Sequence, residues 1–340
     1  MSMRAGLTCL LAALVTFAFM VGGNSSAQAQ KLRLAEAGSA DLKNLIDSVA
    51  FQHAKERGVD YDLVYLKSDD IATQAIIGKQ VDIVVSSLGY SAIQALNAPF
   101  RHFMQLRRLK FYPVVAADTA RSWSEMNGKD FVVHARGSGT EIAAHEIEKE
   151  NKIKFAHLTY LPVSQVRANA LLHGVIKATL LDIEGLQYVM RMAPNKFVVL
   201  PTPNVPVSEA ALYADKNLLA KRHDQVEILV EELLKAFRAS AADPNYIASE
   251  RKRLNINPGL APERVAQIAP FYREAAKQNV YPLNGGGEAA AKADIAFYSQ
   301  AGMLKGDAGS MKVTDFWDFS ILNAALGKVG KAKTAKESAQ

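Results

Sequence analysis

The sequence predicts an α/β protein with two mainly parallel sheets, each flanked by helices. Short apolar runs of strand length alternate with amphipathic segments of helical period, which is the pattern of β-α-β units. The alternation occurs twice, over residues 31–97 and again over 131–185, so we expect two such sheets. After residue 203 the sequence becomes mostly helical, apart from one return strand.

The first block predicts three strands separated by helices. The strands are expected at 31–35, 61–66 and 81–85. The helices are expected at 41–57, at 69–77, where Gly78 is placed as the C-cap, and in a segment that runs to Asn97.

The second block follows two connecting strands, which are expected at 103–109 and 111–116. Its own strands are expected at 131–134, 157–161, 178–181 and 196–200, with helices that end near 151 and 173. A return strand at 208–214 then precedes a long amphipathic helix, whose apolar face includes Val226, Leu233 and Phe237.

Polar side chains follow the strands of the first block. Ser39 comes after the first strand, and Ser86, Ser87 and Tyr90 come after the third. Ligands of open α/β sheets bind at the carboxyl ends of the strands, so these four residues are candidate ligand contacts. The serines have an alternative role, which is to cap the helices that follow them.

The turn Gly137-Ser138-Gly139-Thr140 lies between an expected strand and an expected helix. Backbone N–H groups at a helix start have no partner within the helix, and the helix dipole adds positive potential there. The turn is therefore a candidate site for an anionic or polar ligand group. The alternative is an ordinary N-cap, in which Ser138 or Thr140 serves only the helix.

Two acids follow the expected strand at 178–181. Asp182 and Glu184 would face the same cleft and accept hydrogen bonds from an amine or a hydroxyl group, although Asp182 could equally cap the next helix. Tyr160 and Tyr188 are candidates for an aromatic wall or for the core. Arg136 precedes the glycine turn and would pair with a ligand anion or point into solvent.

The first 29 residues have the pattern of a secretory signal peptide. Arg4 supplies the positive charge, residues 10–21 form a short apolar core, and Ala27-Gln28-Ala29 is a small-x-small cleavage signal. We expect the protein to be exported to the periplasm and to begin at Gln30. The one cysteine, Cys9, lies in this segment, so the mature chain has neither disulfide nor thiol chemistry.

The charge balance does not indicate a nucleic-acid-binding protein. The chain has 40 Lys and Arg against 34 Asp and Glu, and removal of Arg4 leaves 39 against 34, a net charge of +5. Part of the excess lies in the tail, 331–340, which we expect to be disordered and which has no interleaved aromatic residue.

Sequence motifs of enzymes and metal sites are incomplete. His145-Glu146 begins a His-Glu-x-x-His motif, but Lys149 occupies the second histidine position. The glycine turn has Ile142 where a dinucleotide fingerprint has its third glycine, and residues 285–287 are not followed by Lys-Ser/Thr. We therefore predict neither a catalytic residue nor a metal or cofactor.

Several stretches resemble one protein family. AIIGKQVDIVV (75–85), NGKDFVVHARGSGT (127–140), LHGVIKATLLD (172–182) and VTDFWDF (313–319) look like segments of the type II periplasmic solute-binding proteins of ABC importers. The resemblance is to the nitrate/sulfonate/taurine branch, with relatives that bind thiamine-precursor pyrimidines. In that family a tryptophan often precedes the acid at the position of Asp182, and this chain has Leu181.

The resemblance implies a two-lobed type II periplasmic-binding-protein fold. Lobe 1 would comprise 30–112 plus 205–330, and lobe 2 would comprise 113–204. It also implies a monomer that captures a small organic anion or zwitterion, such as a sulfonate or taurine, and delivers it to the permease and ATPase of an ABC importer. Two alternatives remain: a receptor of a tripartite ion-driven (TRAP-type) importer, and a secreted enzyme or sensory module on the same scaffold.

The export prediction can be tested directly. Expression of the full chain in a bacterial host should yield a periplasmic species whose N-terminus, read by mass spectrometry, lies near Gln30, because signal peptidase cleaves after the small-x-small signal. Recovery of only the unprocessed chain in the membrane fraction would contradict it.

Overall fold

The computed structural model describes residues 31–38, 40–86, 89–136, 138–201 and 207–333. The predicted signal peptide at 1–29 and most of the predicted tail lie outside these residues. The chain from Lys31 onward forms one compact unit. None of the helices among the described residues has both the length and the apolar character that crossing a membrane requires.

The first sheet has five strands in the order β2-β1-β3-β10-β4. They are β1 (Leu32–Ala37), β2 (Tyr61–Leu66), β3 (Ile83–Ser86), β4 (Phe100–Arg108) and β10 (Ser208–Asp215). β1 pairs in parallel with β2 and β3, whereas β10 is antiparallel to both β3 and β4. The predicted return strand therefore lies inside the sheet rather than at its edge.

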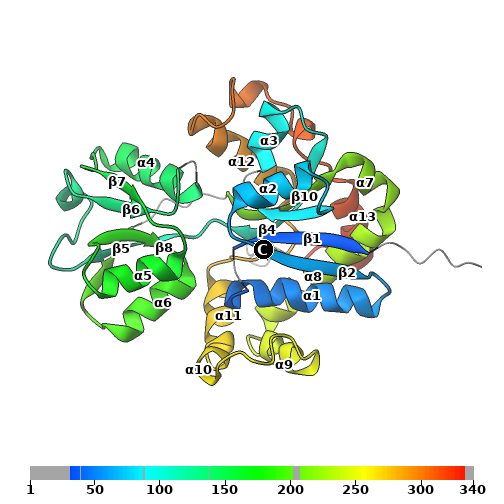
Figure 1. Cartoon of the computed structure of the whole chain (residues 1–340), viewed down its shortest axis with the longest axis horizontal. Helices are drawn as coiled ribbons and strands as arrows, with labels where there is room; N and C mark the ends of the chain where they lie inside the picture. Colours follow the sequence, from blue (N-terminus) through cyan, green and yellow to red (C-terminus); the bar gives the residue numbers. More distant parts are fainter. Residues whose placement is uncertain (1–30, 39, 87–88, 137, 202–206, 334–340) are drawn as a thin grey trace, which may run out of the picture. The chain divides into compact units, whose positions relative to one another are not determined.

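Helices cover both faces of the first sheet (Figure 1). One face packs against the 3₁₀ turn η1 (Leu42–Asn44), α1 (Leu45–Glu56), α8 (His223–Ala242), α9 (Tyr246–Arg253), α11 (Ile268–Lys277) and α13 (Ser320–Val329). The opposite face packs against α2 (Asp69–Ile77), α3 (Gly89–Ala95) and α12 (Gly287–Gln300). The short helices α7 (Lys216–Lys221) and α10 (Pro262–Val265) connect these elements.

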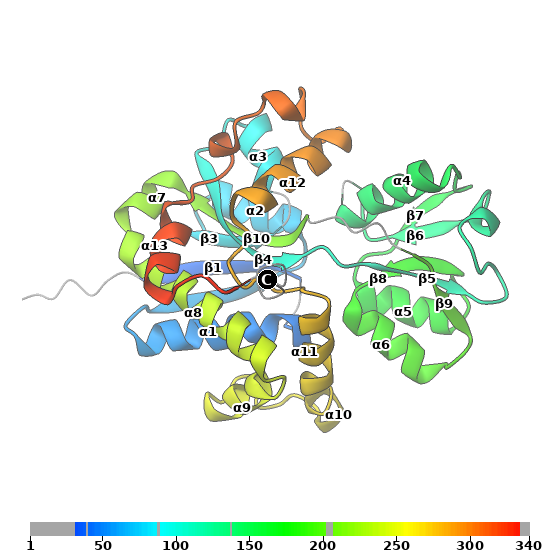
Figure 2. The same ribbon diagram turned by 180° about the vertical axis from the view of Figure 1, so that it is seen from behind.

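The second sheet has the order β7-β6-β8-β5-β9. Its strands are β5 (Tyr112–Ala116), β6 (Phe131–Val133), β7 (Leu158–Tyr160), β8 (Ala178–Leu181) and β9 (Phe197–Val199). Figure 2 shows α4 (Gly139–Asn151) on one face, and α5 (Ser164–Leu172) and α6 (Ile183–Met192) on the other. β6 pairs in parallel with β7 and β8, and β5 is antiparallel to β8 and β9.

The predicted fold class is confirmed, because each half is a mainly parallel sheet with one antiparallel strand inserted. One boundary differs for a local reason: the third strand begins at Ile83 rather than at residue 81. The Asp82 carboxylate accepts from the backbone N–H of Arg33 at 2.9 Å and from its guanidinium at 2.7 Å. This side-chain interaction holds Asp82 against β1, immediately before β3 begins to pair with β1. The proposed lobe boundaries stay a prediction.

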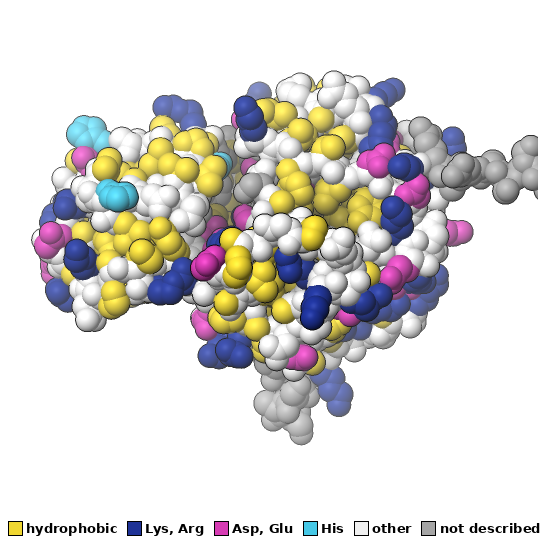
Figure 3. Space-filling view, turned by 60° about the horizontal axis from the view of Figure 1, so that its bottom comes forward, with side chains coloured by type: hydrophobic (Ala, Val, Ile, Leu, Met, Phe, Trp, Pro, Cys, Tyr) yellow, Lys and Arg dark blue, Asp and Glu magenta, His cyan; other side chains and the backbone are white. Residues whose placement is uncertain are grey.

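Charges on the surface are mixed. On the face shown in Figure 3, Lys and Arg side chains are interspersed with Asp and Glu rather than gathered in one basic patch. This face therefore lacks the continuous positive stripe that phosphate backbones require.

A buried ion cluster joins two strands of the first sheet, β4 and β1, to helix α1. Arg107 on β4 donates to Glu36 of β1 at 2.7 Å and also bonds Asp47 of α1. All three side chains are almost fully buried. Burial raises the pKa of both carboxyl groups, and the Arg107 charge opposes that rise. Because burial penalises each charge, the three groups depend on one another.

Arg107→Met should lower the free energy of unfolding by about 3–5 kcal/mol, because it leaves two buried carboxyl groups without their cation. Arg108→Met is the matched control, since the Arg108 guanidinium on the same strand donates only to the Asn279 carbonyl among the described residues. Urea denaturation measures both. Adding Glu36→Gln and Asp47→Asn to Arg107→Met should restore part of the stability. Equal losses in the two arginine variants would contradict this account.

Candidate functional site

A cavity of about 1000 Å³ is lined by residues from both sheets. It lies where parallel strands end: Gly38 follows β1, Ser86 ends β3, His134 follows β6 and Asp182 follows β8. The carboxyl ends of such strands are the usual ligand-binding edge of α/β sheets. Its volume suits a small molecule held between two walls.

The wall beside the first sheet carries paired and unpaired charges. Lys43 of η1 contacts Glu209 of β10 at 3.1 Å. The pKa of Lys43 is raised by Glu209 and the neighbouring acids although burial opposes the rise, so the ammonium form persists. Asp41 lies beside them, and within the described part of the chain its buried Oδ1 atom has no hydrogen-bond partner. Burial, followed by Asp182, raises the pKa of Asp41 against the effect of Lys43.

Ser86 lies in the cavity lining, as the strand-end position predicted. Its hydroxyl donates to the Asp69 carboxylate of α2 at 2.5 Å, and the side chain is almost fully buried. Tyr90 lies elsewhere: it is buried, donates to Asp294 at 2.8 Å and accepts from Trp317 at 2.5 Å. Tyr90 therefore belongs to the core beside α12 and not to the cavity lining. Ser39 and Ser87 lie outside the described residues.

The glycine turn lines the opposite wall. Ser138 and Thr140 bond one another at 2.9 Å, Thr140 accepts from the backbone N–H of His134 at 2.8 Å, and Ser138 donates to the Ala135 carbonyl at 2.7 Å. Ser138 occupies the N-cap position without a side-chain capping bond. The two hydroxyls thus hold the turn closed, which the sequence did not predict. Gly137 lies outside the described residues.

The backbone of the same turn is still available to a ligand. In the described part of the chain, the N–H groups of Gly139 and Thr140 at the start of α4 have no acceptor. A Cβ added to Gly139 would lie 3.4 Å from the nearest atom, a Leu109 methyl group, and Gly139 does not have a positive φ. Glycine is therefore not required there by the backbone conformation or by packing.

His134 is a cavity residue that sequence reasoning missed. Its Nδ1 atom accepts from the backbone N–H of Val163 at 3.1 Å, which places the ring proton of the neutral form on Nε2. Burial, followed by the Arg167 charge, lowers the pKa of His134. Val163 has φ +65°, an uncommon value for a β-branched residue. A single histidine at a strand end gave no distinctive sequence signal.

Arg167 of α5 is the second residue that the sequence did not single out. The side chain is 1% exposed, and its guanidinium donates to the carbonyls of Leu180 at 3.1 Å and Leu161 at 2.9 Å. Burial lowers the pKa of Arg167 to about 10, so the group remains a cation at neutral pH. It lines the cavity on the same wall as His134 and the glycine turn.

Asp182 and Glu184 both line the cavity, and each also has a partner within the protein. Asp182 Oδ1 accepts from the Gly185 backbone N–H at 2.8 Å, so the helix-capping role that the sequence left open is realised. Glu184 forms an ion pair with Arg264 of α10, which also lines the cavity. Burial, followed by the Asp41 charge, raises the pKa of Glu184 to about 7.

The aromatic candidates are divided between two places. Tyr188 lines the cavity. Tyr160 lies outside the lining, where it donates to Glu141, and the Arg136 guanidinium lies 5.4 Å from the centre of its ring. Arg136 therefore points toward Tyr160 rather than toward the cavity.

The charges that line the cavity are balanced in number. The acids are Asp41, Asp69, Asp182, Glu184, Glu209 and Glu263, and the cations are Lys43, Lys67, Arg107, Arg167, Arg191 and Arg264. A site for a simple anion would be expected to carry an excess of cations. The mixed lining instead suits a ligand that has both donor and acceptor groups.

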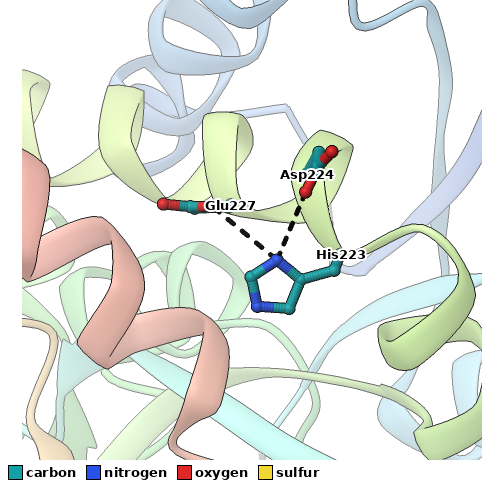
Figure 4. Close-up of side chains that lie close together, drawn as sticks. All are labelled: His223, Asp224 and Glu227. Atoms are coloured by element: carbon teal, nitrogen blue, oxygen red, sulfur yellow. Dashed lines mark ion pairs between the residues drawn. The ribbon is translucent and has the colours of Figure 1, made fainter.

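One group of possible metal ligands occurs outside the cavity (Figure 4). His223 Nδ1 lies 3.6 Å from Asp224 and 3.7 Å from Glu227, at the start of α8. The i, i+4 spacing of His223 and Glu227 is visible in the sequence, although the spacing alone does not distinguish a metal site from a surface pair. Glu227 already contacts the Lys328 ammonium at 2.9 Å, so a metal ion would have to compete with an existing ion pair. We assign no metal to this group.

The two sheets and the cavity at their strand ends define the two-lobed type II periplasmic-binding-protein fold. Solved structures share it. A protein of Bordetella bronchiseptica RB50 matches with a TM-score of 0.68 and 17% identity, over 89% of this chain and 98% of that one.

Two further matches have described ligands. The sulfonate-binding protein SsuA of a putative sulfonate ABC transporter from Methylobacillus flagellatus KT has a TM-score of 0.64 and 17% identity, over 88% of this chain and 94% of that one. The nitrate-binding protein NrtA from Synechocystis PCC 6803 has a TM-score of 0.64 and 10% identity, over 88% and 89%. The likeness confirms the fold that the sequence motifs implied. No family model and no curated protein matches the chain.

Glu184 should make stability depend on pH. A carboxyl group whose pKa is about 7 in the folded state and about 4.5 in the unfolded state stabilises the fold fully below pH 4.5, and this contribution is lost as the pH rises through 7. Glu184→Gln, which cannot ionise, should therefore gain stability relative to the wild type across this range, by up to about 3 kcal/mol at pH 8.

Melting curves between pH 4 and pH 8 would measure this difference. Glu263→Gln is the control, because Glu263 lines the same cavity but is exposed. A difference between Glu184→Gln and the wild type that stays constant with pH would contradict the assignment.

Proposed function

We propose that the protein is an extracytoplasmic receptor that captures a small organic zwitterion or anion, of the sulfonate or taurine kind, in the cavity between its two lobes. The observation that carries the proposal is the cavity itself: about 1000 Å³, at the carboxyl ends of strands from both sheets, with charged groups on both walls. A ligand held there contacts both lobes at once. Asp182, Glu184, Ser86 and the glycine turn are the proposed contacts.

Capture would work through lobe movement. Lobe 1 (30–112 plus 205–330) and lobe 2 (113–204) would rotate about their two connections, and the ligand would favour the arrangement in which both walls touch it. A ligand shifts such an equilibrium only by its difference in affinity for the two arrangements. The N–H groups of Gly139 and Thr140, with the Nε2–H of His134 and the Arg167 guanidinium, would hold the ligand's anionic group from lobe 2.

The proposed partners are the permease and ATPase of an ABC importer, which a monomeric receptor would meet in the periplasm after cleavage of its signal peptide. The sulfonate-binding and nitrate-binding neighbours support this proposal. A TRAP-type importer is the second candidate, because its receptors can also carry a Gly-Ser-Gly-Thr turn. Permease and ATPase genes beside the gene for this protein would favour the first. We propose a binding rather than a catalytic role, which unchanged bound ligand in native mass spectrometry would support.

A thermal-shift screen of small sulfonates, carboxylates and their amine-bearing counterparts tests the receptor role. A compound at about 100 times its dissociation constant should stabilise the protein by roughly 2.7 kcal/mol. The screen should be run beside native mass spectrometry of protein prepared from periplasm. Failure of both to reveal any bound compound would contradict the proposal.

Gly139→Ala separates ligand binding by the turn from a structural role. The added methyl group should fit against Leu109 and leave the melting temperature nearly unchanged, but it would obstruct the approach of a ligand to the free N–H groups. We expect a loss of affinity of about 1–3 kcal/mol in calorimetric titration.

Gly327→Ala is the matched control, because Gly327 lies on α13 with open space around its Cβ position. Thr140→Ala should instead lower the melting temperature, because it removes the acceptor of the His134 N–H. Unchanged affinity in a folded Gly139→Ala protein would contradict the assignment of the turn.

A further inference from the structure

Two carboxylates, from the layers of different sheets, line the same cavity. Asp41 precedes η1 on the side of the first sheet, and Asp182 follows β8 of the second sheet as the N-cap of α6. Both line the cavity, and besides burial the Asp182 charge contributes to raising the pKa of Asp41. Lys43 is the cation that acts on both of them, and its ammonium group is hydrogen-bonded to Glu209 at 3.1 Å.

Among the described residues, each of these two carboxylates has an oxygen without a hydrogen-bond partner. Asp41 Oδ1 is buried and lacks a hydrogen-bond partner in the part of the chain that the structure describes. Asp182 uses Oδ1 for the Gly185 N–H, and no bond to its other oxygen is found among the described residues. A buried carboxylate oxygen without a donor is costly, so this pair is an acceptor site that a ligand would complete.

Three of the other cations of the cavity wall already have partners. Arg107 binds Glu36 and Asp47, Arg264 binds Glu184, and Arg167 donates to two backbone carbonyls. Redirecting any of them toward Asp41 and Asp182 would break an existing interaction. Lys67 is exposed, and no partner of its ammonium group is found among the described residues. A cation on the ligand would supply positive charge at Asp41 and Asp182 without breaking any of these three interactions.

We propose that the cavity selects ligands that carry a cationic nitrogen, and that this ammonium group lies between Asp41 and Asp182 while the ligand's anionic group lies at the start of α4. This inference rests on the proposed receptor function and specifies its substrate class. An ammonium group donates three hydrogen bonds and can serve both carboxylates at once.

An organic ammonium group fits this pair better than a metal ion does. Among the described residues, only His223, Asp224 and Glu227 bring three candidate ligand atoms within 4.8 Å of one another, and they lie outside the cavity. Two carboxylates, one of them engaged as a helix cap, are too few ligands for Ca²⁺, which takes six to eight oxygens. An ammonium group, with three N–H donors, suits two carboxylate acceptors.

The cationic group also explains how a ligand would join the two lobes. Without it, closing the cavity would press two carboxylates together. With it, each lobe gains a charge-assisted hydrogen bond only when the two walls approach. An otherwise identical ligand without nitrogen would bind to the α4 end alone and leave the carboxylates facing one another.

Calorimetric titration with matched pairs tests the inference. The pairs are taurine with ethanesulfonate and β-alanine with propanoate, each of which differs by one amino group. We expect the amine-bearing member of at least one pair to bind about tenfold or more tightly than its amine-free partner. Equal or weaker binding by the amine-bearing members of both pairs would overturn the inference.

Asp41→Asn should abolish this preference by weakening the amine-bearing member about tenfold or more while leaving its amine-free partner unchanged. Asp70→Asn is the matched control, because Asp70 is exposed on α2 and outside the cavity lining, and it should keep the preference. A preference that survives Asp41→Asn would overturn the placement of the ammonium group.

The same experiments test the receptor function separately from the inference about the ammonium group. If ethanesulfonate or propanoate binds and the amine-bearing partners do not, the inference fails and the receptor function stands. If none of the four probes binds, the inference is likewise overturned for ligands with the carbon skeletons of these probes. Accurate-mass analysis of any compound released from the periplasmic protein then decides whether the receptor function stands.

Discussion

The Arg107 guanidinium, held by two buried carboxyl groups, is the interaction on which the first half of the molecule depends. It joins β4, β1 and α1 beneath the cavity, and its side chain also reaches the cavity lining. Three ionisable groups are buried together there, and each is tolerable only while the others are present. Two donors of Arg107 are engaged in this cluster, and its charge also acts on Asp41, so the structural core shapes the charge that a ligand meets.

The two walls of the cavity are built by different physical means. The wall of the second sheet offers donors, which are backbone N–H groups at a helix start, a neutral imidazole oriented by Val163 and a buried guanidinium, together with two carboxyl groups at the start of α6. The wall of the first sheet offers a carboxylate beside an engaged lysine. In the proposed arrangement, donors at the start of α4 and acceptors at Asp41 and Asp182 would orient a ligand and not merely attract it, because only one direction satisfies both ends.

The sequence predicted the fold well and the site in part. Alternating apolar runs locate the strands, and the hydroxyl and glycine residues at 138–140 do line the cavity. Tyr90 was misleading because a tyrosine just after a strand end can turn into the core, where Asp294 accepts its hydroxyl. His134, Arg167 and Asp41 carry no local motif. Their importance comes from contacts with residues that are distant in sequence, which periodicity cannot reveal.

The position of β10 has a consequence for how the chain acquires its structure. β10 lies between β3 and β4, yet it follows β4 by about 100 residues, since Ser208 faces Arg108 and Asp215 faces Phe100. The first sheet therefore cannot be completed until all residues of the second sheet have been synthesised. Contacts of such long sequence separation slow folding. For the proposed export, this delay would keep the first sheet incomplete until β10 arrives.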